Sequence, residues 1–262
     1  MRHLWVLSLT CAVAVGYGGS SLAGAQQTAA ADAAKSQADR SAAQQLLVVR
    51  SASWGAATAR LTLFEKHDGG DWKSLGGPIA VNVGRRGMAW GRGLHAAGEG
   101  PLKKEGDGKS PAGVFSLGTA FGSSPTLPDG ASGFAYLQAR DSTFCVEDVR
   151  SPHYNQIVDG EHVSRTSWER WSPMKRSDGL FDWGVVVHHN EASPQKGAGS
   201  CVFMHKWRGP GQGTSGCTAM AEEDIVTVLR WLDQKRSPLL VQVPDHAYPE
   251  ISEKWGLPAL HD

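Results

Sequence analysis

Short apolar runs recur along the chain, and their lengths favour a fold built mainly of β-strands. Eight runs have the length of β-strands, and clusters of Gly, Pro and Asp between them are typical of turns. They cover residues 46–49, 61–64, 79–83, 114–117, 144–146, 183–187, 201–204 and 239–243. With 32 glycines in 262 residues and one convincing long helix, the sequence predicts a mainly β domain of the α+β class.

The expected helix begins near residue 221. Its apolar side chains recur at i, i+3, i+4 and i+7, which places them on one face that packs on the sheet. They are Ile225, Val228, Leu229 and Leu232. Acidic residues at 222–224 suit the positive end of the helix dipole. We expect Pro238 to end the helix before the chain returns as a strand.

The N-terminal 25 residues predict a secretory signal. A basic start precedes an apolar stretch at 4–15, and small residues lead to Ala25, near which we expect cleavage. The stretch is shorter than the roughly 18 residues that span a bilayer, and no later segment is longer, so we expect no membrane span. The mature protein is expected to be periplasmic or secreted.

Composition divides the remainder of the chain. Residues 26–45 are rich in Ala, Gln and Ser, and their lack of large apolar side chains predicts a low-complexity linker. Residues 46–243 form the expected domain, and 244–262 a C-terminal tail. Lys plus Arg and Asp plus Glu both total 26. This balance gives no indication of the basic face that nucleic acid would need.

Three cysteines remain once the signal, with Cys11, is removed: Cys145, Cys201 and Cys217. Three thiols cannot all pair within one chain. In an oxidising compartment, one disulfide and one free thiol is one arrangement. Three small buried thiols is the alternative.

A histidine and a cysteine flank a Gly-rich loop. His205 is expected at the end of a strand, and Cys217 follows twelve residues later. An imidazole that takes the proton of a thiol produces a competent nucleophile. Gly216 lets a carbonyl approach the backbone, and N–H groups around Gly216 and Cys217 would stabilise an oxyanion. We therefore predict Cys217 as the nucleophile and His205 as its base.

Neighbouring residues complete the candidate site. Thr214 and Ser215 precede the Gly-Cys pair and are expected to line the site. His189 and Asn190 end a buried-looking strand. They would either line the site and orient His205, or serve as ordinary hydrogen-bonding groups at a strand end.

Four segments resemble one known family. Residues 214–217, Thr-Ser-Gly-Cys, are similar to the Ser/Thr-x-Gly-Cys signature of the L,D-transpeptidase catalytic domain, also called the YkuD domain. Residues 104–115 look like its Thr/Ser-Pro-x-Gly-x-Phe segment in a long form. Residues 84–91 and 182–187 resemble the same bacterial branch. The resemblance covers roughly residues 46–243.

The resemblance implies a β-sandwich or barrel with one long helix after the catalytic Cys. It also implies peptidoglycan stem peptides as donor and acceptor. Cys217 would attack the carbonyl of the third residue, a diamino acid, and release D-alanine. The thioester would pass to an amine of another stem, which makes a 3,3 crosslink, or to water, as in a carboxypeptidase. No cofactor or metal is implied, carbapenems would trap Cys217, and we expect a monomer.

Two positions depart from the family pattern. Many members have His where this chain has Ser215, and Arg where it has Ala219. The nucleophile is unaffected, but the donor and the balance of transfer against hydrolysis stay open. Since Cys217 must stay reduced to work, Cys145 and Cys201 are the disulfide candidates, and the alternative is that neither pairs.

Two other classes of function fit parts of the pattern. A zinc metallohydrolase would draw its ligands from a set of five residues. These are His188, His189, Cys201, His205 and Cys217. The other class is a non-catalytic wall-binding module that keeps the fold and lacks turnover.

Overall fold

The structure is a computed structural model, and it describes residues 37–260, apart from 68, 97 and 165–167. The predicted signal and most of the predicted linker lie outside the described residues. Residues 37–42 are helical, and the Arg40 guanidinium donates to the carbonyl of Leu94. Gln45, the first residue of the first strand, is fully buried. The folded body therefore begins before residue 46.

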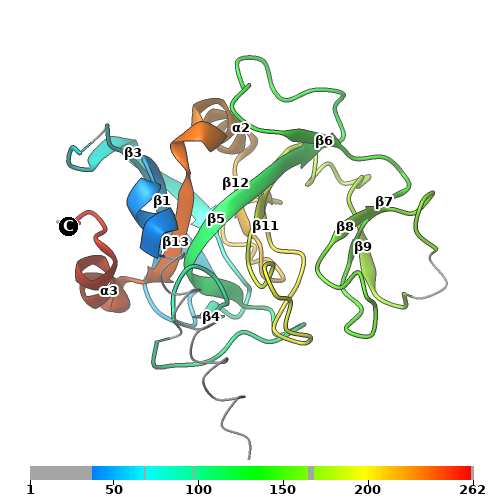
Figure 1. Ribbon diagram of the computed structural model, residues 1–262, viewed down its shortest axis with the longest axis horizontal. Helices are drawn as coiled ribbons and strands as arrows, with labels where there is room; N and C mark the ends of the chain where they lie inside the picture. The colour runs from blue at the N-terminus through cyan, green and yellow to red at the C-terminus, as the bar shows by residue number, and fades with distance from the viewer. Residues whose placement is uncertain (1–36, 68, 97, 165–167, 261–262) are drawn as a thin grey trace, which may run out of the picture.

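Eight strands close into a barrel (Figure 1). Around the ring they run β10, β11, β12, β3, β2, β1, β13 and β5, and β5 pairs with β10 to complete it. Their bounds are β1 Gln45–Ser51, β2 Thr58–Glu65, β3 Lys73–Asn82, β5 Ser110–Gly122, β10 Gly184–Val187, β11 Phe203–Lys206, β12 Thr218–Met220 and β13 Leu239–Pro244. Closure leaves no unpaired strand edge along the ring.

The long strand β5 makes this closure. Its residues 113–116 pair with β13, and its residues 117–121 pair with β10. Two short strands, β4 (Met88–Trp90) and β6 (Tyr136–Gln138), add to β5 outside the ring. The mainly β prediction, with a barrel core, is confirmed.

A second, three-stranded sheet stands beside the barrel, at the right of Figure 1. Its order is β8 (Ile157–Asp159), β7 (Thr143–Val146) and β9 (Trp171–Pro173). Phe144 and Val146 of β7 pack with Trp168 into a small apolar cluster of their own. The chain enters this sheet after β6 and leaves it before β10.

The helix α2 (Glu222–Trp231) carries the predicted apolar face, and Ile225, Val228 and Leu229 are buried against the main core. It ends well before Pro238. Leu232 is extended, with ψ of 133°, and is itself buried. The short 3-10 helix η2 (Gln234–Arg236) follows. The helix therefore ends at Trp231, and the prediction that Pro238 ends it is wrong.

The segment after β13 is folded as far as it is described. The 3-10 helix η3 (Asp245–Ala247) leads into α3 (Tyr248–Trp255). Tyr248 and Ile251 belong to the main apolar core, and the Tyr248 hydroxyl donates to the carbonyl of Pro258 at 2.8 Å. The predicted tail thus contains a helix that packs on the barrel. None of the described helices is both long and apolar enough to cross a membrane.

Candidate active site

The two predicted catalytic residues lie on, or directly before, adjacent strands of the barrel. His205 lies on β11, and Cys217 directly precedes β12, which runs parallel to β11. His205 pairs in register with Ala219. Because alternate residues of a strand share a face, Cys217, Ala219 and His205 point to the same side. All three line one cavity of about 480 Å³. The fold thus brings together a thiol and an imidazole that are twelve residues apart.

The cavity lies between the barrel and the three-stranded sheet. Its barrel side is formed by β11, the Gly-rich loop and Cys217. Its other walls come from the loop near residue 105, from Glu147 after β7, and from Ser172 on β9. Residues remote in sequence therefore surround the thiol.

A tight turn holds Cys217. The Thr214 hydroxyl donates to the carbonyl of Cys217 at 2.6 Å and accepts from the N–H of Gly216 at 3.0 Å. Gly216 has φ of 154°, and a Cβ there would lie 3.1 Å from the carbonyl oxygen of Lys109. Only glycine fits readily. Since Thr214 already occupies the Gly216 N–H, that group is not free for an oxyanion, and the Cys217 N–H remains the candidate donor.

Ser215 stands at the exposed rim of the same turn. It lines the cavity, and its hydroxyl accepts from a guanidinium N–H of Arg85 at 3.1 Å. Thr214 thus shapes the turn that presents Cys217, whereas Ser215 holds an arginine at the cavity mouth.

The Cys217 thiol is half-buried, and its sulfur lies 3.7 Å from the carbonyl oxygen of Cys201. Burial raises the pKa of Cys217 to about 11. The negative charge of Glu147 also raises that pKa, while the Phe203 backbone and the positive charges of Lys103 and Arg176 oppose the rise. Desolvation is the largest of these effects on the pKa, so the resting thiol is protonated at neutral pH.

His205 is almost fully buried, with 6% of its surface exposed. Its Nδ1 donates to the carbonyl of Lys206 at 2.6 Å, because a carbonyl only accepts, and this leaves Nε2 with a lone pair. The Phe181 ring packs edge-on at 4.9 Å. Burial lowers the pKa of His205 to about 4, so the imidazole is neutral. In the described part of the chain no hydrogen bond joins it to Cys217.

The resting pair is therefore a neutral thiol and a neutral imidazole, which predicts a slow, strongly pH-dependent reaction with iodoacetamide. Only the thiolate reacts, and its fraction rises tenfold per pH unit below the pKa. The alkylation rate is expected to climb with pH toward about 11. Intact-mass spectrometry follows the labelling, with Cys217→Ala as the unlabelled control. A plateau well below pH 9 would instead indicate a thiolate–imidazolium pair.

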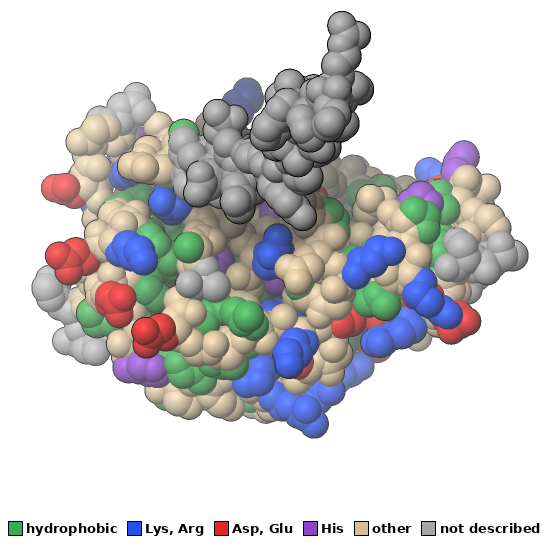
Figure 2. All heavy atoms as spheres, turned by 60° about the horizontal axis from the view of Figure 1, so that its bottom comes forward, with side chains coloured by type: hydrophobic (Ala, Val, Ile, Leu, Met, Phe, Trp, Pro, Cys, Tyr) green, Lys and Arg blue, Asp and Glu red, His purple; other side chains and the backbone are tan. Residues whose placement is uncertain are grey.

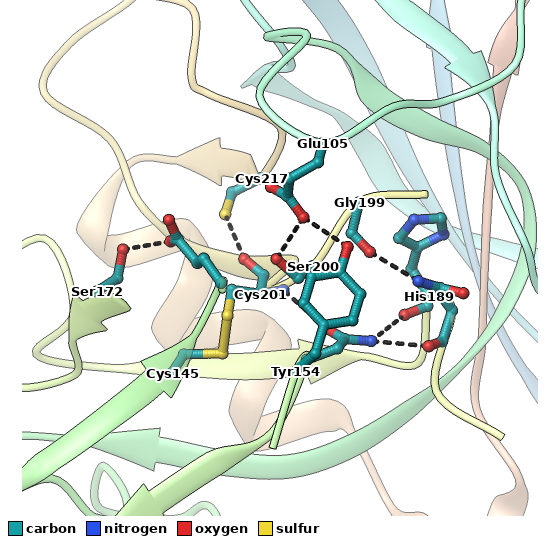
Figure 3. The surroundings of a disulfide bond; sticks show 12 residues. Glu105, Cys145, Tyr154, Ser172, His189, Gly199, Ser200, Cys201 and Cys217 are labelled. Atoms are coloured by element: carbon teal, nitrogen blue, oxygen red, sulfur yellow. Dashed lines mark hydrogen bonds between the residues drawn. A yellow bond between two sulfur atoms is a disulfide. The ribbon is translucent and has the colours of Figure 1, made fainter. Parts of the chain in front are cut away.

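A disulfide joins Cys145 to Cys201, and Cys217 is free (Figure 3). The bond connects β7 of the small sheet to the segment that leads into β11. Cys201 has φ of 55°, and its N–H donates to the side chain of Asn155 at 2.8 Å. These contacts hold the Cys201 carbonyl against the Cys217 sulfur. β11 begins only at Phe203, later than the predicted run at 201, because Cys201 is not extended.

Removing the disulfide is expected to destabilise the protein. The bond closes a loop with a sequence separation of 56, which is worth about 4 kcal/mol on the chain-entropy model. The double variant Cys145→Ser, Cys201→Ser should lose that amount in urea denaturation. Cys217→Ala, which keeps the bond, should lose less than about 1 kcal/mol. Equal losses in the two variants would mean that the bond contributes nothing.

His189 and Asn190 are not in the cavity lining. His189 accepts from the Arg92 N–H and donates to the Ala198 carbonyl, so both ring nitrogens are used. The Asn190 side chain bonds to the backbone of Gln195 and Gly199. In Figure 3 His189 lies beyond Gly199, away from Cys217. The hydrogen bonds of His189 and Asn190 therefore order the loop before Cys201. Of the two alternatives, the structure favours ordinary hydrogen bonding at a strand end over a place in the site.

Several cavity residues were not predicted from sequence. Glu105 accepts from the hydroxyls of Tyr154 and Ser200 at 2.6 and 2.7 Å (Figure 3). Glu147 and Arg176 line the cavity from the small sheet and the loop after it. No local pattern singles out these residues, since their proximity to Cys217 depends on how the small sheet docks.

The five residues of the zinc alternative do not converge. Cys201 is consumed by the disulfide. His188 contacts Ser116 at 3.0 Å and Glu191 at 3.1 Å, and His189 serves the loop. Across the described residues no three His, Cys, Asp or Glu side chains form a group that could hold a metal ion. The arrangement instead suits thiol chemistry.

The comparisons with known proteins agree with this geometry. The family model described as the L,D-transpeptidase catalytic domain, YkuD, matches residues 56–243. A search of curated proteins finds no match to the chain. The matched segment contains the barrel strands from β2 to β12, the small sheet, His205 and Cys217. Because it also covers well over half of the chain, the protein belongs to the L,D-transpeptidase catalytic domain (YkuD) family.

Proposed function

We propose that this protein is an exported L,D-transpeptidase that forms 3,3 crosslinks through a Cys217 thioester. Family membership assigns an L,D-transpeptidase-type activity that modifies peptidoglycan. The observation that carries the finer proposal is the placement of Cys217 and a neutral His205 on one face of adjacent strands, in one cavity. Export rests on the signal pattern of residues 1–25. We further propose that the enzyme is periplasmic or secreted and acts as a monomer.

Acylation begins when a stem-peptide carbonyl displaces solvent from the cavity. His205 Nε2 takes the proton of the Cys217 thiol as the sulfur attacks the carbonyl carbon. The Cys217 N–H is the candidate donor to the developing oxyanion. The imidazolium then gives its proton to the leaving D-alanine nitrogen, and a thioester remains. The Lys206 carbonyl stabilises the transient charge on His205.

The charge of the cavity suits a stem peptide, whose free carboxylates are anionic. Among the described residues five cationic side chains line it, Arg85, Lys103, Arg170, Arg176 and Arg208, against two carboxylates. On one face of the molecule, basic side chains gather in the lower right of the view (Figure 2).

Many family members have an arginine at the position of Ala219. In this chain Arg176 and Arg208 could supply that positive charge. Both flank Asp178, at 2.5 and 3.1 Å. The Arg176 guanidinium also lies over Phe181, which packs on His205. We assign this cluster to the carboxylate of the donor.

A single incubation tests the proposal. The mature protein is mixed with disaccharide tetrapeptide muropeptides, and the products are separated and weighed by mass spectrometry. Crosslinked dimers are the expected result. Tripeptide with free D-alanine and no dimer would make the protein an L,D-carboxypeptidase, the second candidate, which the same thioester supports. No change in the muropeptides would overturn both.

A further inference from the structure

The cavity-facing side of the small sheet differs from its outer side. Phe144 and Val146 of β7 belong to the apolar cluster on one face. Cys145 and the next alternate residue, Glu147, point to the other face. Cys145 pairs in register with Ser172 of β9, and Glu147 and Ser172 both line the cavity with Cys217. The sheet therefore presents a carboxylate to the reaction centre.

Glu147 is held in place but not neutralised. The Ser172 hydroxyl donates to its carboxylate at 2.5 Å, and its backbone N–H donates to the Arg170 carbonyl at 3.0 Å. Among the described residues it forms no ion pair. Three of the cations that line the cavity pair with other carboxylates, Lys103 with Asp107 at 2.6 Å and Arg176 and Arg208 with Asp178. A partly buried carboxylate without a cation favours a positively charged ligand.

The disulfide ties this carboxylate to the nucleophile. Glu147 stands two residues after Cys145, which is bonded to Cys201, and the Cys201 carbonyl touches the Cys217 sulfur at 3.7 Å. The charge of Glu147 reaches the thiol and contributes to the raised pKa of Cys217. The other cavity carboxylate, Glu105, is instead occupied by the hydroxyls of Tyr154 and Ser200.

We propose that Glu147 binds and deprotonates the amine of the acyl acceptor, and so directs the thioester toward transfer rather than hydrolysis. This inference rests on the proposed function and adds a residue to its second half-reaction. The acceptor class is a primary alkylamine that is cationic at neutral pH. A donor stem needs no such group, because it reacts through a carbonyl.

The protons and bonds of the step balance. The acceptor ammonium enters beside Glu147 and gives one proton to the carboxylate. The free amine attacks the thioester carbon, so a C–N bond forms and the C–S bond breaks. The nitrogen loses a second proton to His205, which passes it to the departing Cys217 sulfur. Glu147 then releases its proton to solvent, and the free thiol is restored.

The test measures how the acyl-enzyme partitions. Wild type and Glu147→Gln are acylated with a tetrapeptide muropeptide and offered either a second tetrapeptide muropeptide or hydroxylamine, which is largely uncharged at neutral pH. Glutamine keeps an acceptor for Ser172 but loses the charge. We expect the ratio of transfer to hydrolysis to fall about 10- to 100-fold for the alkylamine. Acylation should not slow, because loss of the Glu147 charge removes a contribution that raises the pKa of Cys217, and transfer to hydroxylamine should change less than about threefold.

Glu161→Gln serves as the matched control, because this carboxylate is exposed after β8 of the same sheet and outside the cavity lining. It should behave as wild type. An unchanged partition in Glu147→Gln, or an equal loss with both acceptors, would overturn the assignment and leave the proposed function standing. Absence of an acyl-enzyme in wild type would overturn the proposed function, and the role of Glu147 with it.

Discussion

Replacing Cys217 with alanine is expected to abolish the thioester and lower turnover of tetrapeptide muropeptides at least about 10⁴-fold, as loss of a catalytic nucleophile does in other acyl-transfer enzymes. No other free thiol lines the cavity among the described residues. Intact-mass spectrometry during the reaction should show a mass increase in wild type alone. Turnover should be lost without a loss of binding, because the substituted atom carries the chemistry rather than the recognition.

Comparing wild type with Cys217→Ala distinguishes an enzyme from a non-catalytic wall-binding module. A module with an inactive site would bind muropeptides equally in wild type and Cys217→Ala and turn over neither. Urea denaturation of both proteins checks that the variant is folded. Residual turnover in Cys217→Ala close to that of wild type would place the nucleophile elsewhere.

His205→Gln should slow formation of the acyl-enzyme by about 10²- to 10³-fold near neutral pH, the usual contribution of a general base. The effect should be large because burial raises the pKa of Cys217 to about 11, so the thiol does not ionise unaided. As the pH rises toward that value, thiolate forms without a base. The defect should therefore shrink as pH increases from about 7 to 10.

His162 supplies the control for this measurement, since it is a histidine on the small sheet's loop with 79% of its side chain exposed. His162→Gln should acylate at the wild-type rate throughout. The measurement is single-turnover acylation followed by intact mass. A defect in His205→Gln that stays constant with pH would point to lost structure instead of a lost base.

The regular elements of the barrel were predictable because their signals are local. Each predicted strand overlaps an observed one, and the face of α2 followed from its i, i+3, i+4, i+7 spacing. The shortest strands, such as β4, β6 and β12, were not predicted. Three residues are too few for a periodic pattern, and these strands exist because a longer neighbour offers them hydrogen bonds.

Some residues of the site could likewise be predicted from the sequence, and others could not. Cys217 and His205 were identified from residue types around a Gly-rich loop and from the family signature. His189 and Asn190 satisfied the same reasoning from sequence, yet their polar atoms are used by the loop before Cys201. The sequence around two polar residues at a strand end does not predict which groups their side chains will contact in the folded protein.

The mainly β class, the amphipathic helix α2 after Cys217, and the thiol and imidazole could all be predicted from the sequence, because each depends on residues close together in the chain. Long-range packing, in contrast, was needed to show that β5 meets β10 to close the barrel, that Cys145 pairs with Cys201, and that Glu147 faces the cavity. It also decided that the Cys217 and His205 pair rests in its neutral form. Strand pairing, burial and desolvation depend on side chains that are far apart in the sequence, so no local sequence pattern predicts them.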